Sequence, residues 1–381
     1  MLLLLILPML VSTVVVNTTA MLRDALADPA VLSIELASRT FLLEAPLEIR
    51  RSLSLSAESG EGAILDGQNG TRVLEIRSAA DVTIRGITIR NGFVDADSSE
   101  TPNYKEGGAG VLIQESNVTM LACAIESNRA EIGWNGGGLQ IIDTRNASTL
   151  PWQRHNSHLR LEDCNISSNT ASTKNGMNGG GIGVLGACTV DLVRCYIEHN
   201  EARGIDAHGG GLGFDIEYQW HHGGGYYFEY DVTLTDCVVQ HNSVAGPEEK
   251  FDAVSKFTSG AGMHIATAGV VKFVRGLIYD NVASCDLCTA VDITDDGHCR
   301  GDGGHAGAVS VASNAVYPDR LLKVEFEAVH IDYNHACVPW ECHGNVTEVA
   351  MWHAGVTSTS VVLVPWKCHG GVVEVPWKCH G

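Results

Sequence analysis

Short apolar stretches separated by glycines and polar turns recur six times between residues 107 and 336. Each repeat opens with a pair of glycines and a short apolar strand, as in residues 136–141, 179–184 and 209–214. A second strand with two alternating apolar positions follows, and then a third strand that ends in an asparagine. Alternation with a period of two predicts strands with one buried face, and no segment between them is long enough for a crossover helix. The pattern therefore predicts an all-β chain.

The asparagine that ends the third strand aligns the repeats with one another. It stands at Asn128, Asn169, Asn200, Asn242, Asn281 and Asn334, with Asn91 as an irregular forerunner. An isoleucine or valine precedes it by three residues in every repeat, and a cysteine precedes it by five residues in four of them: Cys123, Cys164, Cys195 and Cys237. A pattern that repeats in this way is typical of a solenoid.

Three short strands per repeat without a helix predict one coil of a parallel β-helix. Each strand then hydrogen-bonds its counterpart in the next coil, about 4.8 Å away, so that like residues stack on like. The six asparagines are predicted to form a structural ladder in which each amide bonds to the backbone and to the next asparagine. The four cysteines are interpreted as small buried hydrophobes, because burial in apolar surroundings raises the pKa of a thiol and makes it inert.

The motifs of these repeats are similar to those of a known group of proteins. The start Gly-Gly-Ala/Gly-apolar and the finish apolar-x-x-Asn-x-Ala resemble the repeats of polymorphic outer membrane proteins, within the wider pectin-lyase-like β-helix superfamily. The resemblance covers about residues 30–336. It implies a right-handed parallel β-helix solenoid, here of about eight coils of three short strands. It does not single out a function, because the superfamily includes lyases, hydrolases, epimerases, adhesins and passive surface proteins.

The two ends of the chain differ from the repeats. Residues 1–13 are almost wholly apolar and are interpreted as a signal peptide. Strand 14–16 and a short amphipathic helix over residues 21–27 are predicted to cap a β-helix that spans residues 14–336, with irregular coils over 28–92 and six clear repeats over 107–336. Residues 337–381 contain the heptapeptide Val-Pro-Trp-Glu/Lys-Cys-His-Gly three times. We interpret them as a low-complexity tail that is disordered or loosely packed. Two other interpretations are a soft-metal site and the translation of a short DNA repeat.

Composition and charge indicate the compartment. The 381 residues are 45% hydrophobic, which is enough for a sizeable core, and carry a formal net charge of -20. This charge argues against a nucleic-acid partner and suits an extracellular or cell-surface protein without a membrane span in the mature chain. Six sequons, at Asn17, Asn69, Asn117, Asn146, Asn165 and Asn345, would be acceptors in a eukaryotic secretory pathway.

Inserted residues indicate where a ligand would bind. From the fourth residue of the glycine strand to the ladder asparagine there are 17 or 18 residues in repeats one, three and five, but 30 in repeats two and four and 25 in repeat six. The extra loops therefore share one corner. The candidate ligand-binding residues in them are Trp152, Trp220, His221, Tyr226 and Tyr227. We interpret these rings as a platform for a polysaccharide or a cell-surface protein, with a lid packed on the helix flank as the alternative.

An acidic loop lies on the way to the last repeat. Asp292, Asp295, Asp296 and Asp302 supply hard oxygen ligands at turn-like spacing, which suits calcium, although the expected function requires no cofactor. Two alternatives remain: a zinc site made by Cys285, Cys288, Cys299 and His298, and an acidic surface loop pinned by disulfides.

No catalytic residue can be assigned from the sequence. Asp295, Asp296 and His305 resemble the motifs of polygalacturonase-like hydrolases, but here they share one loop and no Arg-x-Lys element follows. Asp206, His208, Arg203 and Asp302 are candidates for an acidic groove. The sequence thus favours an exported surface or matrix protein that binds glycan or protein through loops on one edge. A polysaccharide lyase or glycoside hydrolase and a structural spacer are the alternatives.

Overall fold

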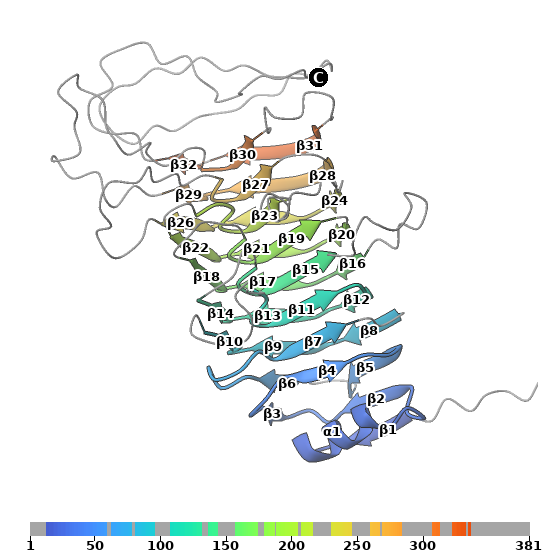
Figure 1. Cartoon of the computed structure of the whole chain (residues 1–381). Helices are drawn as coiled ribbons and strands as arrows, with labels where there is room; N and C mark the ends of the chain where they lie inside the picture. The colour runs from blue at the N-terminus through green and yellow to red at the C-terminus, as the bar shows by residue number, and fades with distance from the viewer. Residues whose placement is uncertain are drawn as a thin grey trace, which may run out of the picture.

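The computed structural model describes residues 13–58, 62–77, 81–95, 107–131, 136–143, 157–173, 179–186, 188–204, 207–215, 230–245, 260–266, 269–283, 307–312, 322–332 and 334–336. These residues form a parallel β-helix whose coils stack as rungs from the N-terminal end to the C-terminal end (Figure 1). The predicted all-β solenoid is confirmed. Every strand pairing in it is parallel, between successive coils, as the pairing of β19 with β23 illustrates.

Three sheets run along the axis of the solenoid, and we name them A, B and C. Sheet B has eight strands: β4 (Leu47–Ile49), β7 (Leu74–Arg77), β11 (Val111–Gln114), β15 (Leu139–Asp143), β19 (Ile182–Gly186), β23 (Leu212–Asp215), β27 (Met263–Ala266) and β30 (Val309–Ala312). Sheet C has seven short strands: β10 (Phe93–Val94), β14 (Arg129–Ala130), β18 (Thr170–Thr173), β22 (Glu201–Gly204), β26 (Ser243–Ala245), β29 (Val282–Ala283) and β32 (His335–Ala336).

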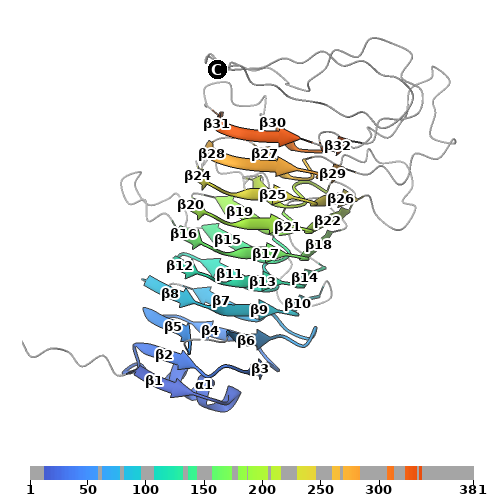
Figure 2. The ribbon, with the colours of Figure 1, turned by 180° about the vertical axis from the view of Figure 1, so that it is seen from behind.

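Sheet A has 17 strands in two parallel stacks. Stack A1 contains β1 (Thr13–Val16), β2 (Ser33–Leu36), β5 (Leu53–Ala57), β8 (Asp81–Arg85), β12 (Asn117–Leu121), β16 (Ser157–Glu162), β20 (Cys188–Val193) and β24 (Tyr230–Thr235). Stack A2 contains β3 (Thr40–Leu42), β6 (Ala63–Asp66), β9 (Ile87–Arg90), β13 (Ala124–Glu126), β17 (Asn165–Ser167), β21 (Tyr196–Glu198) and β25 (Val238–Gln240). The long strands β28 (Gly269–Tyr279) and β31 (Leu322–Asp332) run through both stacks (Figure 2).

One coil passes from sheet B to A1, to A2 and then to C, as β19, β20, β21 and β22 do. The three strands predicted from the sequence are those of B, A1 and A2. The structure adds a fourth strand in sheet C, which has only two to four residues. It is too short to show an alternating pattern, and its inward position is a small side chain such as Ala202. A1 turns into A2 at a residue with positive φ, such as Arg194 (53°), and A2 turns toward C at another, such as His199 (55°).

The inward side chains form one continuous hydrophobic core along the solenoid. In a single coil Ile182, Val184, Val190, Leu192 and Ile197 are at most 1% exposed. The register places Leu192 between leucines of the coils on either side. Each buried side chain of this size contributes about 1.5–3 kcal/mol relative to exposure, and identical neighbours fill the space between coils without gaps.

The predicted cap is present at the N-terminal end. Helix α1 (Thr19–Ala27) begins two residues earlier than expected because the Thr18 side chain accepts a hydrogen bond from the Met21 backbone N–H at 3.1 Å. Leu22 and Ala25 are its buried residues. At its other end Arg51 donates to the carbonyl groups of Ala25 and Asp28, at 3.2 and 2.9 Å. The helix therefore closes the core where the first coil would otherwise face water.

The remaining predictions about the ends of the chain fall largely outside the described residues. Of the predicted signal peptide, only Thr13 is described, as the first residue of β1. The tail 337–381 lies wholly outside. Within the described residues, no helix has the length and hydropathy needed to cross a membrane.

Candidate functional site

Two long connections, after β15 and after β23, join sheet B to stack A1. In the coil between them, β19 ends at Gly186 and β20 begins at Cys188, so a single residue makes the turn. In contrast, 13 residues (144–156) separate β15 from β16, and 14 (216–229) separate β23 from β24. Because β15 pairs with β19 and β19 with β23, the bases of these two loops are two coils apart on the same corner. We call this corner the loop-bearing edge.

Buried groups hold the base of the first long loop. Asp143 ends β15 and Ser157 begins β16, and their exposed fractions are 4% and 0%. The Asp143 carboxylate accepts hydrogen bonds from the backbone N–H of Ser157 at 3.0 Å and from its hydroxyl at 3.2 Å. On the next coil Gly186 (φ 85°) lies against Asp143, and a Cβ there would be 2.4 Å from the Asp143 carbonyl oxygen. The two ends of this loop are therefore fixed relative to each other.

An aromatic pair holds the base of the second long loop. Tyr230 begins β24 and is 1% exposed, and its ring centroid lies 5.8 Å from that of Phe214 in β23. This tilted arrangement is one that aromatic pairs favour, and it joins the last strand before the loop to the first strand after it.

Stack A1 presents a polar face next to the first loop base. His158 and Asp191 point outward from β16 and β20, and a His158 ring nitrogen lies 3.1 Å from an Asp191 carboxylate oxygen. Their side chains are 39% and 36% exposed. Arg160, also on the outer face of β16, pairs with Glu162 at 2.9 Å. These groups offer hydrogen-bond donors and acceptors to a ligand held at the loop-bearing edge.

The residues predicted from the sequence as ligand contacts lie outside the described residues. This is true of Trp152, Trp220, His221, Tyr226 and Tyr227, and also of the carboxylates Asp292, Asp295, Asp296 and Asp302. In the part of the chain that is described, no three His, Cys, Asp or Glu side chains are arranged to hold a metal ion. Calcium binding through residues 292–302 therefore stays a prediction.

The candidates for an acidic groove are partly described. Arg203 pairs with Glu201 at 2.7 Å. The His208 ring stacks on the ring of His264, one coil away, with centroids 4.4 Å apart. Burial, followed by the charge of His208, holds the pKa of His264 well below its ordinary value, so this imidazole is neutral. Asp206 and Asp302 are outside the described residues.

The asparagines form a continuous hydrogen-bonded ladder through the turn between A2 and C. The Asn200 side-chain oxygen accepts from the backbone N–H of Asn169 at 3.1 Å and from its amide nitrogen at 2.9 Å. The Asn200 amide nitrogen donates to the Ile166 carbonyl at 2.8 Å and to the Asn242 side-chain oxygen at 3.0 Å. The same pattern runs from Asn128 to Asn334. These residues hold coils together and are not available to a ligand.

The forerunner Asn91 does not belong to this ladder. Gly92 occupies the equivalent position, and its backbone N–H donates to the Asn128 side-chain oxygen at 2.8 Å. Asn91 instead has a positive φ of 52° and donates to the Asp66 carboxylate at 3.0 Å. The ladder of asparagine side chains therefore starts at Asn128.

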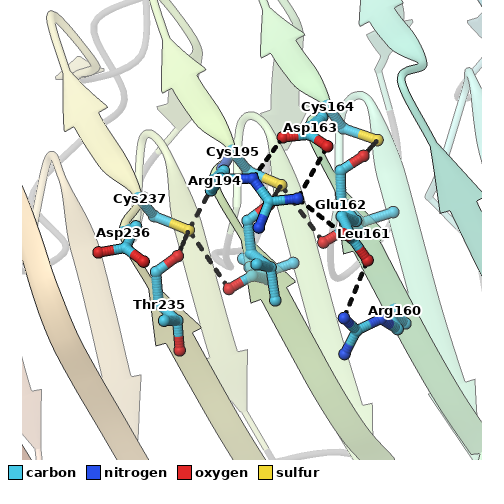
Figure 3. Close-up of polar contacts among 12 residues, drawn as sticks. Arg160, Leu161, Glu162, Asp163, Cys164, Arg194, Cys195, Thr235, Asp236 and Cys237 are labelled. Carbon is cyan, nitrogen blue, oxygen red and sulfur yellow. Dashed lines mark hydrogen bonds and ion pairs between the residues drawn. The ribbon is translucent and has the colours of Figure 1, made fainter.

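Four cysteines form a second buried column at the bend between A1 and A2, and Figure 3 shows three of them, Cys164, Cys195 and Cys237. Cys123, Cys164, Cys195 and Cys237 are all free thiols and at most 3% exposed. Their thiols donate to carbonyl oxygens, as Cys195 does to Leu161 at 3.5 Å. Contact with the Cys164 sulfur, together with burial, raises the pKa of Cys123, and contacts with Cys164 and Cys237 together with burial raise that of Cys195. The column has no direct access to solvent, which suits a packing role.

An ion-pair ladder that the sequence pattern did not predict lies on the outside of this cysteine column. Asp163, Arg194, Asp236 and Arg275 stand one coil apart with alternating charge, each at the bend where φ is positive. Arg194 donates to both carboxylate oxygens of Asp163, at 2.6 and 2.9 Å, and to Glu162 at 2.7 Å (Figure 3). Arg275 likewise donates one hydrogen bond to each carboxylate oxygen of Asp236, both at 2.8 Å. The sequence does contain a signal for this ladder: a charged residue stands directly before each of Cys164, Cys195 and Cys237.

Replacing Arg194 tests this ion-pair ladder. The hydrogen bonds from Arg194 hold the pKa of Asp163 below its ordinary value, so the pair stabilises the fold above the ordinary carboxylate pKa and loses this effect as the pH falls through the lowered one. We expect Arg194→Gln to raise the pKa of Asp163 and to lower the urea midpoint at pH 7, with the two proteins converging near about pH 2. Arg85→Gln, at another exposed arginine, is the control. A midpoint difference that is the same at both pH values would contradict this role.

Comparison with known proteins supports the same architecture. Residues 57–217 match a family model described as the right handed beta helix region. With its stacked parallel sheets the protein is a right-handed parallel β-helix protein, which confirms the predicted fold class. No curated protein and no solved structure matches the chain.

Proposed function

We propose that this β-helix protein is exported and acts at the cell surface or in the matrix, where it binds a polysaccharide or a cell-surface protein through the loop-bearing edge. The observation that carries the proposal is the pair of long loops that leave one corner from fixed bases two coils apart. Two coils correspond to about 10 Å along the axis, a distance that an extended chain of sugar residues can bridge.

The composition of the loops supports a ligand of this kind. Each loop contains tryptophan, at position 152 or 220, and the second also contains His221, Tyr226 and Tyr227. Tryptophan and tyrosine provide a large stacking face with a polar edge, which suits sugar rings as well as protein surfaces. The resemblance to pectin-lyase-like proteins and to polymorphic outer membrane protein repeats is compatible with a surface role, and the net charge of -20 disfavours nucleic acid. Calcium held by residues 292–302 is part of the same proposal.

A glycan-array experiment tests the proposal. The protein, secreted from a host with a supplied signal peptide, is screened with calcium present. We expect Trp152→Ala combined with Trp220→Ala to weaken binding by about five- to a hundredfold, because each ring lost from a stacking contact costs roughly 0.5–1.5 kcal/mol. Trp134→Ala is the matched control, because Trp134 lies in the connection between β14 and β15, at a different corner.

A second variant removes the loops without touching the fold. Residues 144–156 and 216–229 are each replaced by the single-residue turn that connects β19 to β20. Loss of binding with an unchanged melting temperature supports the loop-bearing edge as the site. Retained binding would show that the ligand lies elsewhere, and release of reducing or unsaturated sugar ends would replace the binding role by catalysis.

A further inference from the structure

Asn165 and Tyr196 are neighbours on the outer face of stack A2. They begin strands β17 and β21, and the register pairs them directly, one coil apart. The next residue of each strand, Ile166 or Ile197, points inward and is fully buried. The side chains of Asn165 and Tyr196 therefore both point outward, about 4.8 Å apart along the axis. Asn165 is also the first residue of the sequon Asn165-Ile166-Ser167.

The fold does not use the Asn165 side chain. Its amide oxygen is buried and has no hydrogen-bond partner within the described part of the chain. By contrast, the amide of Asn169, four residues later, donates to both a carbonyl and the next asparagine. A buried acceptor without a partner is unfavourable, so packing gives no reason for asparagine at position 165. Asn165 as a whole is only half-buried, so other atoms of the residue remain accessible.

Tyr196 stands exposed on the outer face of stack A2. It is 51% exposed, the largest value for a phenylalanine, tyrosine or tryptophan in the described residues. Its neighbour on one side is Val238, which is only half-buried, and on its other side the column continues through Asn165 to Ala124. The small Ala124 leaves room above the sheet beside Asn165, so a group attached there could lie against the ring of Tyr196.

We propose that Asn165 carries an N-linked glycan whose first N-acetylglucosamine packs against the Tyr196 ring. One group accounts for both observations: it uses the asparagine that the fold leaves unused, and it covers the ring that the fold leaves exposed. In the transfer, the Asn165 amide nitrogen forms a bond to C1 of the sugar and gives up one proton to solvent. The bond from C1 to the pyrophosphate of a lipid-linked oligosaccharide breaks, and the lipid pyrophosphate leaves. The inference rests on the export part of the proposed function.

Asn117 provides an internal comparison. It begins β12, is exposed and opens the sequon Asn117-Val118-Thr119. Its neighbours in the register are Asp81 and His158, so no phenol or indole ring stands beside it. A glycan on Asn117 would extend into solvent, whereas one on Asn165 would be held against the sheet.

The experiment uses the full chain secreted from a eukaryotic host with a supplied signal peptide, so it does not depend on whether the chain directs its own export. Glycopeptide mass spectrometry is expected to show a glycan on Asn165, absent in Asn165→Gln. Under native conditions, peptide N-glycosidase should release the Asn165 glycan about two- to tenfold more slowly than the Asn117 glycan, the factor expected for a stacking contact. Tyr196→Ala should remove this difference, and Tyr196→Phe should keep it.

Two results would overturn the inference. One is an unmodified Asn165 in a protein whose Asn117 is modified. The other is a release rate at Asn165 that is the same in Tyr196→Ala as in the unaltered protein. The proposed export is tested separately, with the chain carrying its own residues 1–13. If that chain stays inside the cell while the protein with the supplied signal peptide is modified at Asn165, the export proposal is wrong and the glycan inference stands.

Discussion

Gly180→Ala is expected to prevent the protein from reaching its native fold. Gly180 lies just before β19, where the turn from sheet C enters sheet B. A Cβ at this position would lie 2.4 Å from both the carbonyl carbon and the carbonyl oxygen of Glu201, and 2.4 Å from the Gly210 carbonyl oxygen. All three atoms are backbone atoms, in strand β22 and in the turn before β23, so they cannot move aside as a flexible side chain would. We expect the loss of stability to be roughly 3 kcal/mol or more.

The measurement is urea denaturation followed by circular dichroism, with the yield of folded protein as a second readout. Gly70→Ala is the matched control. The nearest atoms to a Cβ there are 3.9 and 4.0 Å away, which is ordinary contact, and its change in stability should stay within about 0.5–1 kcal/mol. If Gly180→Ala unfolds at the same urea concentration as the unaltered protein, the backbone of neighbouring strands does not approach Gly180 as closely as described.

Asn200→Ala is expected to cause a large loss of folding stability, because Asn200 lies in the middle of the asparagine ladder. It removes two donated and two accepted side-chain hydrogen bonds in a site that is fully buried. The Ile166 carbonyl and the Asn169 backbone N–H then stay in the core without those partners, and a small cavity forms. Because each buried group without a partner costs about 1–3 kcal/mol, the expected loss is roughly 3–5 kcal/mol.

Bacterially expressed protein without glycans is the material for this test, since it separates the hydrogen bonds from any modification. Asn117→Ala serves as the control: Asn117 is exposed on β12, and its change should stay within about 0.5 kcal/mol. Equal effects of the two substitutions would mean that the ladder does not hold the coils together.

Much of the solenoid could be predicted because each coil repeats the same local pattern. Isoleucine or valine three residues before the asparagine appears in every repeat, so an irregular position in one coil is outweighed by its counterparts. The capping helix was also predictable, since residues 21–27 are amphipathic and follow a strand. The fourth strand of each coil was not, because a strand of two residues such as Arg129–Ala130 contains no period to detect.

Positions that depart from the repeat could be assigned only from the structure. Asn91 has the right residue type for the ladder, but the register of β10 with β14 gives the ladder position to Gly92. The bases of the long loops show the same limit. That the loops share a corner could be counted from the sequence, whereas the contacts of Asp143 with Ser157 and of Phe214 with Tyr230 join residues on opposite sides of the inserted loops.

The sequence by itself determined the class of fold, the buried columns and the corner from which the loops leave, because these depend on alternation and spacing within one coil. Only the tertiary structure decided which outward side chains become neighbours. Arg194 meets Asp163 across 31 residues, and Tyr196 meets Asn165 across the same separation, yet the next pair, Arg275 with Asp236, is 39 residues apart. Inserted loops make these separations unequal, so the outer surface is set by the hydrogen-bonded register between coils and not by a constant period.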